Sequence, residues 1–190
     1  MAQHNDESLL RSAKKGKLEL VKEYWSKTEN GNATNAASIA LILSIVNGHF
    51  DVFKFFVDAG VDLNLVNNIE SSLPNSSKYN YIKEYKGDAS FLSGTALICA
   101  VKKYDFRMVQ YLVNKGASVN VTDKDGNIAL YYALLKRCDI EMIKFLLRCG
   151  SHIGETIKKL DNRALFHQDF SSYWIDIKKQ LINYIFTMFY

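Results

Sequence analysis

The chain has 190 residues, of which 48% are hydrophobic and 23% are charged. A chain of this length and composition can bury a sizeable core, which excludes the collagen-like and disordered classes. Its formal net charge of +4 is too small for a nucleic-acid-binding tail, and its single proline, Pro74, excludes a proline-rich linker.

The cysteines and the first residues bear on the compartment. Cys99, Cys138 and Cys149 are odd in number and have no CxxC spacing, so they predict no disulfide framework or zinc site and favour a reducing compartment. The first residues are polar and acidic, unlike a signal peptide, and no apolar run approaches the roughly 18 residues of a membrane helix. We therefore expect a cytoplasmic protein without membrane contact.

The N-terminal third contains two segments that are similar to each other, and each predicts a pair of helices. The first, about residues 6–30, opens with Asp6, which favours a helix start. The second, about residues 36–64, has one apolar run before Gly48 and another that ends at Gly60. Since one helix pair cannot bury its apolar face alone, the copies are expected to stack.

An insertion over about residues 65–92 separates the second copy from the third. Its first half contains Pro74 and several Asn and Ser residues, and it predicts a loop. Its second half predicts a short helix with Tyr81 and Tyr85 on one face, and Tyr79 stands just before them. These tyrosines favour partner contact or packing over a plain mobile spacer, and all three interpretations stay open.

The third and fourth copies, about residues 93–121 and 126–153, repeat the pattern, with Leu97 and Leu130 standing 33 residues apart. In the second runs, apolar residues recur at helical spacing: Val109, Leu112 and Val113, then Ile143, Leu146 and Leu147. A glycine follows each run, where a left-handed residue commonly ends a helix. The fourth copy has one more residue between its runs than the third, so we expect a distorted turn near Arg137.

A divergent fifth copy is expected over about residues 161–190. Its last part, from Tyr173 onward, is strongly apolar. We expect this copy either to cap the end of the stack or to continue into further chain.

These copies resemble the ankyrin repeat. Residues 116–120 read Gly-Ala-Ser-Val-Asn, close to the family's closing Gly-Ala-Asp-x-Asn, and Gly48-His49 matches its Gly-His between the two helices. The leucine of the family's Thr-Pro-Leu-His motif is present three times: Leu41, Leu97 and Leu130. The proline and histidine of that motif are replaced in these copies, and its threonine remains only as Thr95. The Thr–His hydrogen bonds between neighbouring repeats are therefore expected to be missing.

The resemblance implies an all-α fold: an ankyrin-like solenoid of about four to five helix-pair repeats with a long inserted loop, as a single domain over residues 1–190. Ankyrin-like stacks generally bind other proteins, through turn tips and the concave face of the first helices. Carried over by position, the exposed pair before the inter-helix turn is Lys14-Lys15 in the first copy and Lys102-Lys103 in the third. In the fourth copy the pair is Leu135-Lys136, and Arg137 adjoins it, so a basic ladder is expected.

Aromatic residues and a charged turn accompany this ladder. Tyr131 and Tyr132 lie on the first helix of the fourth copy, and Lys124 and Asp125 occupy a tight turn before it. The expected partner-binding residues are Lys102, Lys103, Tyr131, Tyr132, Lys136, Arg137, Lys124, Asp125, Tyr79, Tyr81 and Tyr85. Two interpretations stay open: a groove for an acidic protein surface, and a solvated lysine-rich face.

Motifs of catalysis are missing from the sequence. It has no HExxH, no Walker loop, no GxSxG and no GxGxxG, and its four histidines show no ligand spacing. We therefore predict no catalytic residue, no cofactor and no metal, and a non-enzymatic protein-interaction module.

The source and two alternative functions stay open. The lysine, asparagine, isoleucine and tyrosine content suits an ankyrin-like effector that a bacterium delivers into the host cytosol without a classical signal peptide, and it fits a protozoan or a large virus too. One alternative is a nucleic-acid or nucleotide binder that uses the basic ladder with Tyr131 and Tyr132, whose binding would weaken steeply with salt. The other is an enzyme with an unrecognised site.

Overall fold

The computed structural model describes residues 2–27, 35–67, 92–166 and 168–189. The chain falls into two compact units, residues 1–151 and residues 152–190. The named elements of the described residues are all α-helices, and their one β-type contact is an isolated bridge between Asn67 and Gly94. A single repeat domain over the whole chain stays a prediction.

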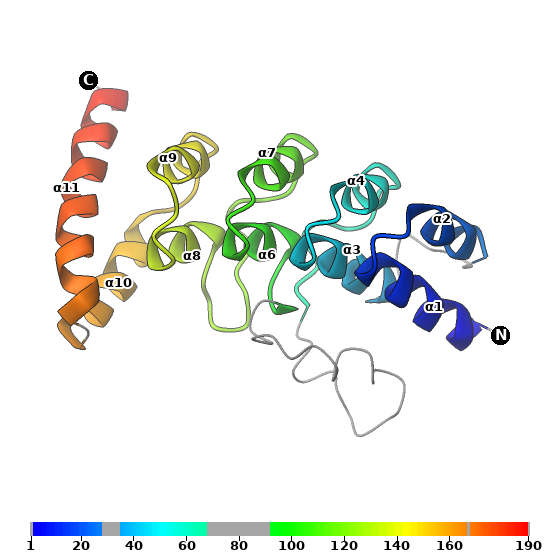
Figure 1. Ribbon diagram of the computed structural model, residues 1–190. Helices are drawn as coiled ribbons and strands as arrows, with labels where there is room; N and C mark the ends of the chain where they lie inside the picture. The colour runs from blue at the N-terminus through cyan, green and yellow to red at the C-terminus, as the bar shows by residue number, and fades with distance from the viewer. Residues whose placement is uncertain (1, 28–34, 68–91, 167, 190) are drawn as a thin grey trace. The chain divides into compact units, whose positions relative to one another are not determined.

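The described residues of the first unit form four helix pairs (Figure 1). In chain order they are α1 (Ala2–Lys14) with α2 (Leu18–Ser26), α3 (Asn35–Val46) with α4 (Phe50–Asp58), α6 (Ala96–Lys102) with α7 (Phe106–Asn114), and α8 (Ala129–Leu135) with α9 (Ile140–Arg148). The first helices, α1, α3, α6 and α8, pack in one row, and the second helices form another row beside it (Figure 1). This all-α repeat solenoid confirms the predicted fold class.

The first helices carry most of the core. Leu41, Leu97 and Leu130, which the sequence aligns, are each no more than 1% exposed. Burial of a leucine side chain stabilises a fold by about 2 kcal/mol. Every residue from Ile39 to Val46 on α3 is buried, because this helix has a packed neighbour on either side. The stacked pairs thus share one continuous apolar layer.

Left-handed glycines follow α4, α7 and α9, as predicted. The backbone angle φ is +82° at Gly60, +94° at Gly116 and +87° at Gly150. The amide that follows each glycine bonds back to the helix, as Val61 N does to Phe56 O at 3.3 Å. This pattern satisfies carbonyls that the helix end would otherwise leave without a donor.

An insertion lies between the second and third pairs, and backbone hydrogen bonds join its two ends. Asn67 N donates to Gly94 O at 3.0 Å, and Gly94 N donates to Asn67 O at 2.8 Å. The three tyrosines predicted to contact a partner from this insertion lie outside the described residues: Tyr79, Tyr81 and Tyr85.

The second unit consists of α10 (Gly154–Phe166) and α11 (Gln168–Phe189). This helix pair begins before the predicted copy at residues 161–190, and its role as a cap stays a prediction. No helix in the described part of the chain is long and apolar enough to span a membrane.

A polar contact accompanies the apolar face between these two helices. Trp174 and Leu181 of α11 are buried. Trp174 Nε1 donates to Asp161 Oδ1 at 2.6 Å, and Lys178 Nζ lies 2.7 Å from the same oxygen. The hydrogen bonds from Lys178 and Trp174 lower the pKa of Asp161.

Candidate functional site

The turn between the two helices of a repeat has one feature in common in the four described repeats. One residue of each turn has a left-handed backbone: Gly16 (φ +68°), Gly48 (φ +73°), Tyr104 (φ +60°) and Arg137 (φ +57°). Glycine adopts this conformation freely, whereas a residue with a Cβ is destabilised there by roughly 1–2 kcal/mol. The third and fourth repeats therefore place long side chains where the first two have none.

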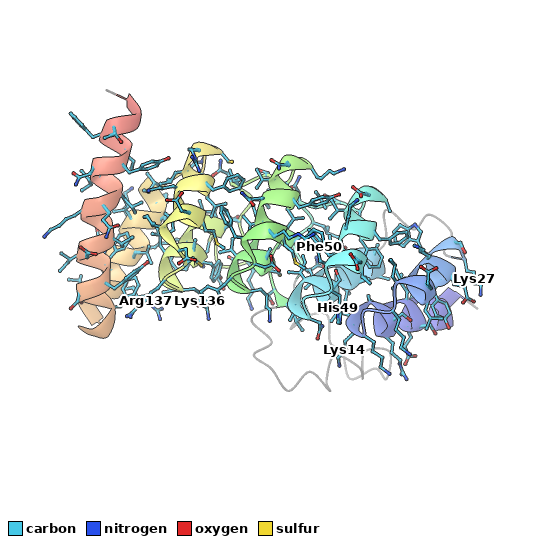
Figure 2. The ribbon with its side chains drawn as sticks, turned by 45° about the horizontal axis from the view of Figure 1, so that its top comes forward. Lys14, Lys27, His49, Phe50, Lys136 and Arg137 are labelled. Atoms are coloured by element: carbon cyan, nitrogen blue, oxygen red, sulfur yellow. The ribbon has the colours of Figure 1, made fainter. Side chains whose placement is uncertain are left out.

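His49 joins the first two repeats at these turns, as expected of the family's inter-helix histidine. Its Nε2 lies 2.9 Å from the Lys14 carbonyl oxygen. Its ring covers Gly16 so closely that a Cβ there would fall 2.6 Å from Nδ1. Lys14, His49, Lys136 and Arg137 lie along one edge of the stack (Figure 2). We call the residues of the four turns the turn edge: 15–17, 47–49, 103–105 and 136–139.

The basic ladder predicted on this edge is only partly present. Lys103 and Arg137 are exposed, and Lys136 is half-buried. Lys102 was expected beside them as an exposed residue, which is wrong, because it is only 4% exposed. Its Nζ donates to the Ser93 carbonyl oxygen at 3.0 Å and lies 4.2 Å from the centroid of the Tyr132 ring. A buried ammonium needs such partners, so Lys102 joins the third repeat to the fourth.

Tyr132 extends this connection to the loop before α8. Its hydroxyl donates to Asp123 Oδ2, and Asp123 Oδ1 accepts from the amides of Asp125 and Asn127 at 3.0 Å each. Burial and the neighbouring carboxylate raise the pKa of Tyr132 well above its ordinary value. The phenol is thus held neutral as a hydrogen-bond donor inside the fourth repeat.

The other predicted residues of this repeat are more accessible. The tight turn over residues 123–126 is confirmed by the hydrogen bond from Gly126 N to Asp123 O at 3.0 Å. Lys124 and Asp125 are exposed at its tip, and Tyr131 is half-buried. These residues lie near the N-terminus of α8, at the other end of that helix from Lys136.

The fourth turn carries the extra residue that the sequence predicted. Three residues, 103–105, connect α6 to α7, whereas four residues, 136–139, connect α8 to α9. Asp105 caps α7 by accepting from Met108 N at 3.0 Å. Asp139 stands at the same place before α9, and its side chain makes no capping hydrogen bond.

A pocket of about 260 Å³ lies beside this turn. Its lining residues are Tyr104, Phe106, Asp139, Ile140, Glu141 and Met142. The Tyr104 hydroxyl donates to the Lys136 carbonyl oxygen at 2.8 Å, which fixes the tyrosine ring. The Phe106 ring meets the Phe145 ring edge to face, with centroids 5.5 Å apart. Sequence reasoning missed this pocket, although Tyr104 at a position of glycine was a usable signal.

Comparison with known protein families identifies these helix-pair repeats. A family model described as "Ankyrin repeats (many copies)" matches residues 93–147. These repeats are ankyrin repeats. Ankyrin repeats are in general protein–protein interaction modules and are typically non-enzymatic, and their stacking gives them an extended binding surface.

The curated relatives are viral ankyrin repeat proteins. One from fowlpox virus is 25% identical over 138 residues, which are 66% of this chain and 40% of that protein. Another from fowlpox virus is 43% identical over 55 residues, 29% of this chain and 11% of the relative. One from Acanthamoeba polyphaga mimivirus is 52% identical over 40 residues, 21% of this chain and 9% of the relative. The chain thus matches less than half the length of each of these relatives.

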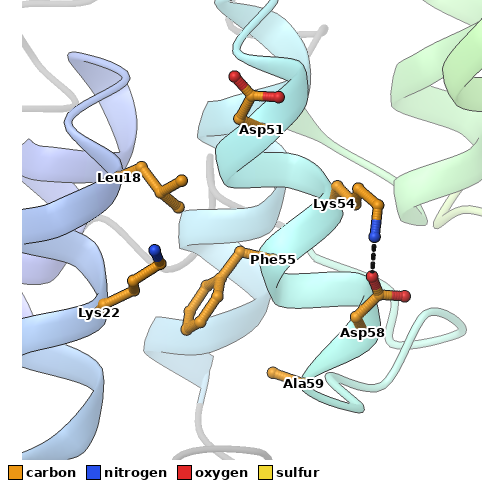
Figure 3. Close-up of a pocket in the computed structure, with 7 residues that line it drawn as sticks. All are labelled: Leu18, Lys22, Asp51, Lys54, Phe55, Asp58 and Ala59. Atoms are coloured by element: carbon orange, nitrogen blue, oxygen red, sulfur yellow. Dashed lines mark hydrogen bonds and ion pairs between the residues drawn. The ribbon is translucent and has the colours of Figure 1, made fainter.

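We call the second helices, α2, α4, α7 and α9, the outer helices. A second hollow, of about 480 Å³, lies on the outer helices of the first two ankyrin repeats (Figure 3). Leu18, Phe55 and Ala59 supply its apolar walls. Lys54 and Asp58 also line it, and they form an ion pair with each other (Figure 3). Because Lys54 and Asp58 pair with each other, these charged groups of the hollow are less available to a ligand than the carboxylates of the pocket beside Tyr104.

Asp58 also joins the second ankyrin repeat to the third. Its Oδ1 accepts from the Tyr111 hydroxyl at 2.7 Å and lies 2.7 Å from Lys115 Nζ. Hydrogen bonds from Lys115, Lys54 and Tyr111 hold the pKa of the Asp58 carboxyl far below its ordinary value.

Aromatic contacts connect every neighbouring pair of outer helices. The ring centroids are 6.0 Å apart for Phe55 with Trp25, 6.0 Å for Tyr111 with Phe50, and 5.5 Å for Phe145 with Phe106. Phe55, Tyr111 and Phe145 occupy the same position of their helices, a signal that sequence reasoning did not use. This row fixes the spacing of the repeats.

Two of the cysteines, Cys99 and Cys138, are buried in the repeat core. Burial raises the pKa of Cys99 to about 12 and that of Cys138 to about 11, so both are neutral thiols at pH 7. Within the ranges that the structure describes, no three His, Cys, Asp or Glu residues gather so that they could hold a metal ion.

Proposed function

We propose that this chain is a non-catalytic protein-interaction module that binds a partner protein through its third and fourth ankyrin repeats. The turn edge carries this proposal. Lys103-Tyr104 and Lys136-Arg137 stand at equivalent positions, and each second residue holds a left-handed backbone. Strained residues of this kind cluster where their side chains have a function, so we expect these side chains to contact a ligand.

The charge of the edge indicates the kind of partner. Lys103, Lys136 and Arg137 on one edge favour an acidic protein surface, which they would attract and orient. The turns are already held by hydrogen bonds, such as Asp105 N to Ala100 O at 3.2 Å, so binding orders little further backbone.

Other predicted residues would extend this contact. Lys124, Asp125 and Tyr131 would add to it from the other end of α8. The insertion tyrosines Tyr79, Tyr81 and Tyr85 keep the same proposed role. Lys102 does not, because it is buried against Tyr132.

The viral relatives bear on where the partner is met. Fowlpox virus and a mimivirus encode ankyrin repeat proteins similar to this chain. We therefore propose a host protein as the partner and the host cytosol as the place of contact. The chain would then act as an effector on that host protein.

Affinity capture from eukaryotic cytosol tests the proposed module. Wild type is compared with a turn-edge variant, Lys103→Glu with Lys136→Glu and Arg137→Glu. The matched control carries the same charge change on α2, on the residue after it, and on α9: Lys22→Glu, Lys27→Glu and Arg148→Glu. We expect wild type and control to capture the same protein and the turn-edge variant to lose it.

Two further results separate the alternatives. Equal capture by all three proteins contradicts a role of the turn edge. Capture that disappears after nuclease treatment contradicts a protein partner and favours nucleic-acid binding. Circular dichroism melts of each variant show that the fold is kept.

A further inference from the structure

We infer that the pocket beside Tyr104 receives an arginine side chain of the partner protein. This inference rests on the proposed function, and it adds the chemistry by which one partner residue is recognised.

The size of the pocket suits a single side chain. Its volume is about 260 Å³, below the roughly 300–1,000 Å³ of small-molecule sites. The Tyr104 and Phe106 rings and the Met142 side chain supply apolar walls. Rings of this kind accept the aliphatic stem of a long side chain and stack on a planar cation.

The walls are fixed before any ligand arrives. The Tyr104 ring is held by its hydroxyl on the Lys136 carbonyl, and the Phe106 ring is held by Phe145. A pocket that is ordered in advance loses little conformational entropy on binding. Aromatic anchors of this kind dominate the binding energy of protein interfaces.

Two carboxylates give the pocket its charge. Asp139 and Glu141 both line it, and both are exposed. The Asp139 carboxylate makes no capping hydrogen bond to α9. Glu141 pairs with Lys144 at 3.0 Å, an exposed pair that a ligand can replace at small cost.

Apolar walls beside two carboxylates select a guanidinium. Its planar fork bonds carboxylates through paired N–H groups while its face stacks on an aromatic ring. An aliphatic ligand would make no use of the carboxylates, and an acidic ligand would be repelled by them. The turn edge around the pocket is basic, so the arginine is expected to have acidic neighbours in the partner.

The methyl resonances of methionine report on the pocket directly. Met142 lines it, whereas Met108 on α7 is not among its lining residues and serves as an internal reference. The probe is the peptide acetyl-Glu-Arg-Glu-amide, titrated into the full chain labelled at its methionine methyls. The control peptide replaces arginine with citrulline, which has the same shape and no charge.

We expect a saturable shift of the Met142 methyl with the arginine peptide and no shift of Met108. Loss of charge-assisted hydrogen bonds should make the citrulline peptide bind about tenfold more weakly. Asp139→Asn with Glu141→Gln should weaken the arginine peptide by a similar factor. Glu19→Gln removes an equivalent Glu–Lys pair on α2 and should leave the affinity at the wild-type value.

Tyr104→Gly gives the sharpest variant, because glycine suits the left-handed backbone and the fold should persist. We expect it to abolish the Met142 shift. An unmoved Met142 methyl in wild type, equal affinity for the two peptides, or wild-type affinity in Tyr104→Gly overturns the inference.

The inference and the proposed function can fail separately. If the turn-edge variant loses its captured protein and Tyr104→Gly keeps it, the pocket is refuted and the interaction module stands. If the cytosol yields no partner while the Met142 response holds, the arginine pocket stands and the proposed module is contradicted.

Discussion

The first two ankyrin repeats and the next two place different residues at the left-handed position of the inter-helix turn. Each inter-helix turn needs one left-handed residue, which is glycine at positions 16 and 48 and Tyr104 or Arg137 in the later repeats. At Gly16 a neighbouring ring fills the space of a side chain, since His49 lies against it. At Tyr104 the side chain projects from the edge and lines a pocket.

This difference separates a structural half of the turn edge from a half that presents side chains. Glycine at Gly16 allows close contact between repeats, which stabilises the stack. Tyr104 and Arg137 make their turns less stable because each has a Cβ at a left-handed position, but they expose an aromatic and a cationic group. Substitutions at equivalent positions should therefore have opposite effects in the two halves.

The largest expected effect is at Gly16. In Gly16→Ala the new Cβ meets both an unfavourable backbone angle and the His49 ring, and it breaks the contact of that ring with Lys14 O. We expect the free energy of unfolding to fall by about 3 kcal/mol in urea titrations. Gly48→Ala is the matched control, because nothing lies within 4 Å of its Cβ position. It should cost only about 1 kcal/mol, and equal losses would contradict a role for the His49 contact.

Lys102 and Lys103 give the next effect, because they are neighbours with opposite roles. Lys102→Ala removes a buried ammonium from the Tyr132 ring and from the Ser93 carbonyl. We expect the free energy of unfolding to fall by about 2 kcal/mol. Lys103 is exposed, so Lys103→Ala should stay within about 0.5 kcal/mol of wild type. Similar values for the two variants in chemical denaturation would show that Lys102 does not join the repeats.

Sequence periodicity predicted the repeats because each helix pair uses the same apolar positions. Leu41, Leu97 and Leu130 aligned in the sequence and are buried in the core. Counting residues between runs likewise predicted the lengthened turn before α9. These features depend on local spacing, which one sequence contains.

The burial of Lys102 could not be predicted from local spacing. Position in the repeat placed it beside Lys103, but its burial depends on Ser93 and Tyr132, which other segments bring to it. The pocket beside Tyr104 has the same origin, since residues from two turns, α7 and α9 line it together. Contacts between repeats decide such features, and a motif match within one repeat does not contain them.

Exchanging residues between the two halves tests the comparison itself. Arg137→Gly should raise the free energy of unfolding by about 1 kcal/mol, because glycine suits the left-handed backbone. Gly48→Arg should lower it by a similar amount, about 1 kcal/mol. Urea titrations measure the free energy of unfolding of both variants. A loss of stability in Arg137→Gly would mean that contacts of its side chain outweigh the strain.

The smallest expected effect concerns acid, at the junction of the second and third repeats. Three donors lower the pKa of Asp58 below its ordinary value of 3.8. The contribution of a carboxylate whose pKa is lowered in the folded state is full above the ordinary pKa, and it is lost as the pH falls toward the folded one. Stability of the wild type should therefore fall between about pH 5 and pH 2 more steeply than that of Asp58→Asn.

Urea titrations at pH 7 and pH 3 measure this difference. Other carboxyl groups titrate in both proteins, so the comparison between variants isolates Asp58. Lys115→Met in the Asp58→Asn background should add no further acid dependence, because its partner is already neutral. The third and fourth repeats meet on their outer helices through Phe106 and Phe145, which do not titrate. Parallel acid dependence in wild type and Asp58→Asn would show that packing, and not this carboxylate, joins the second and third repeats as well.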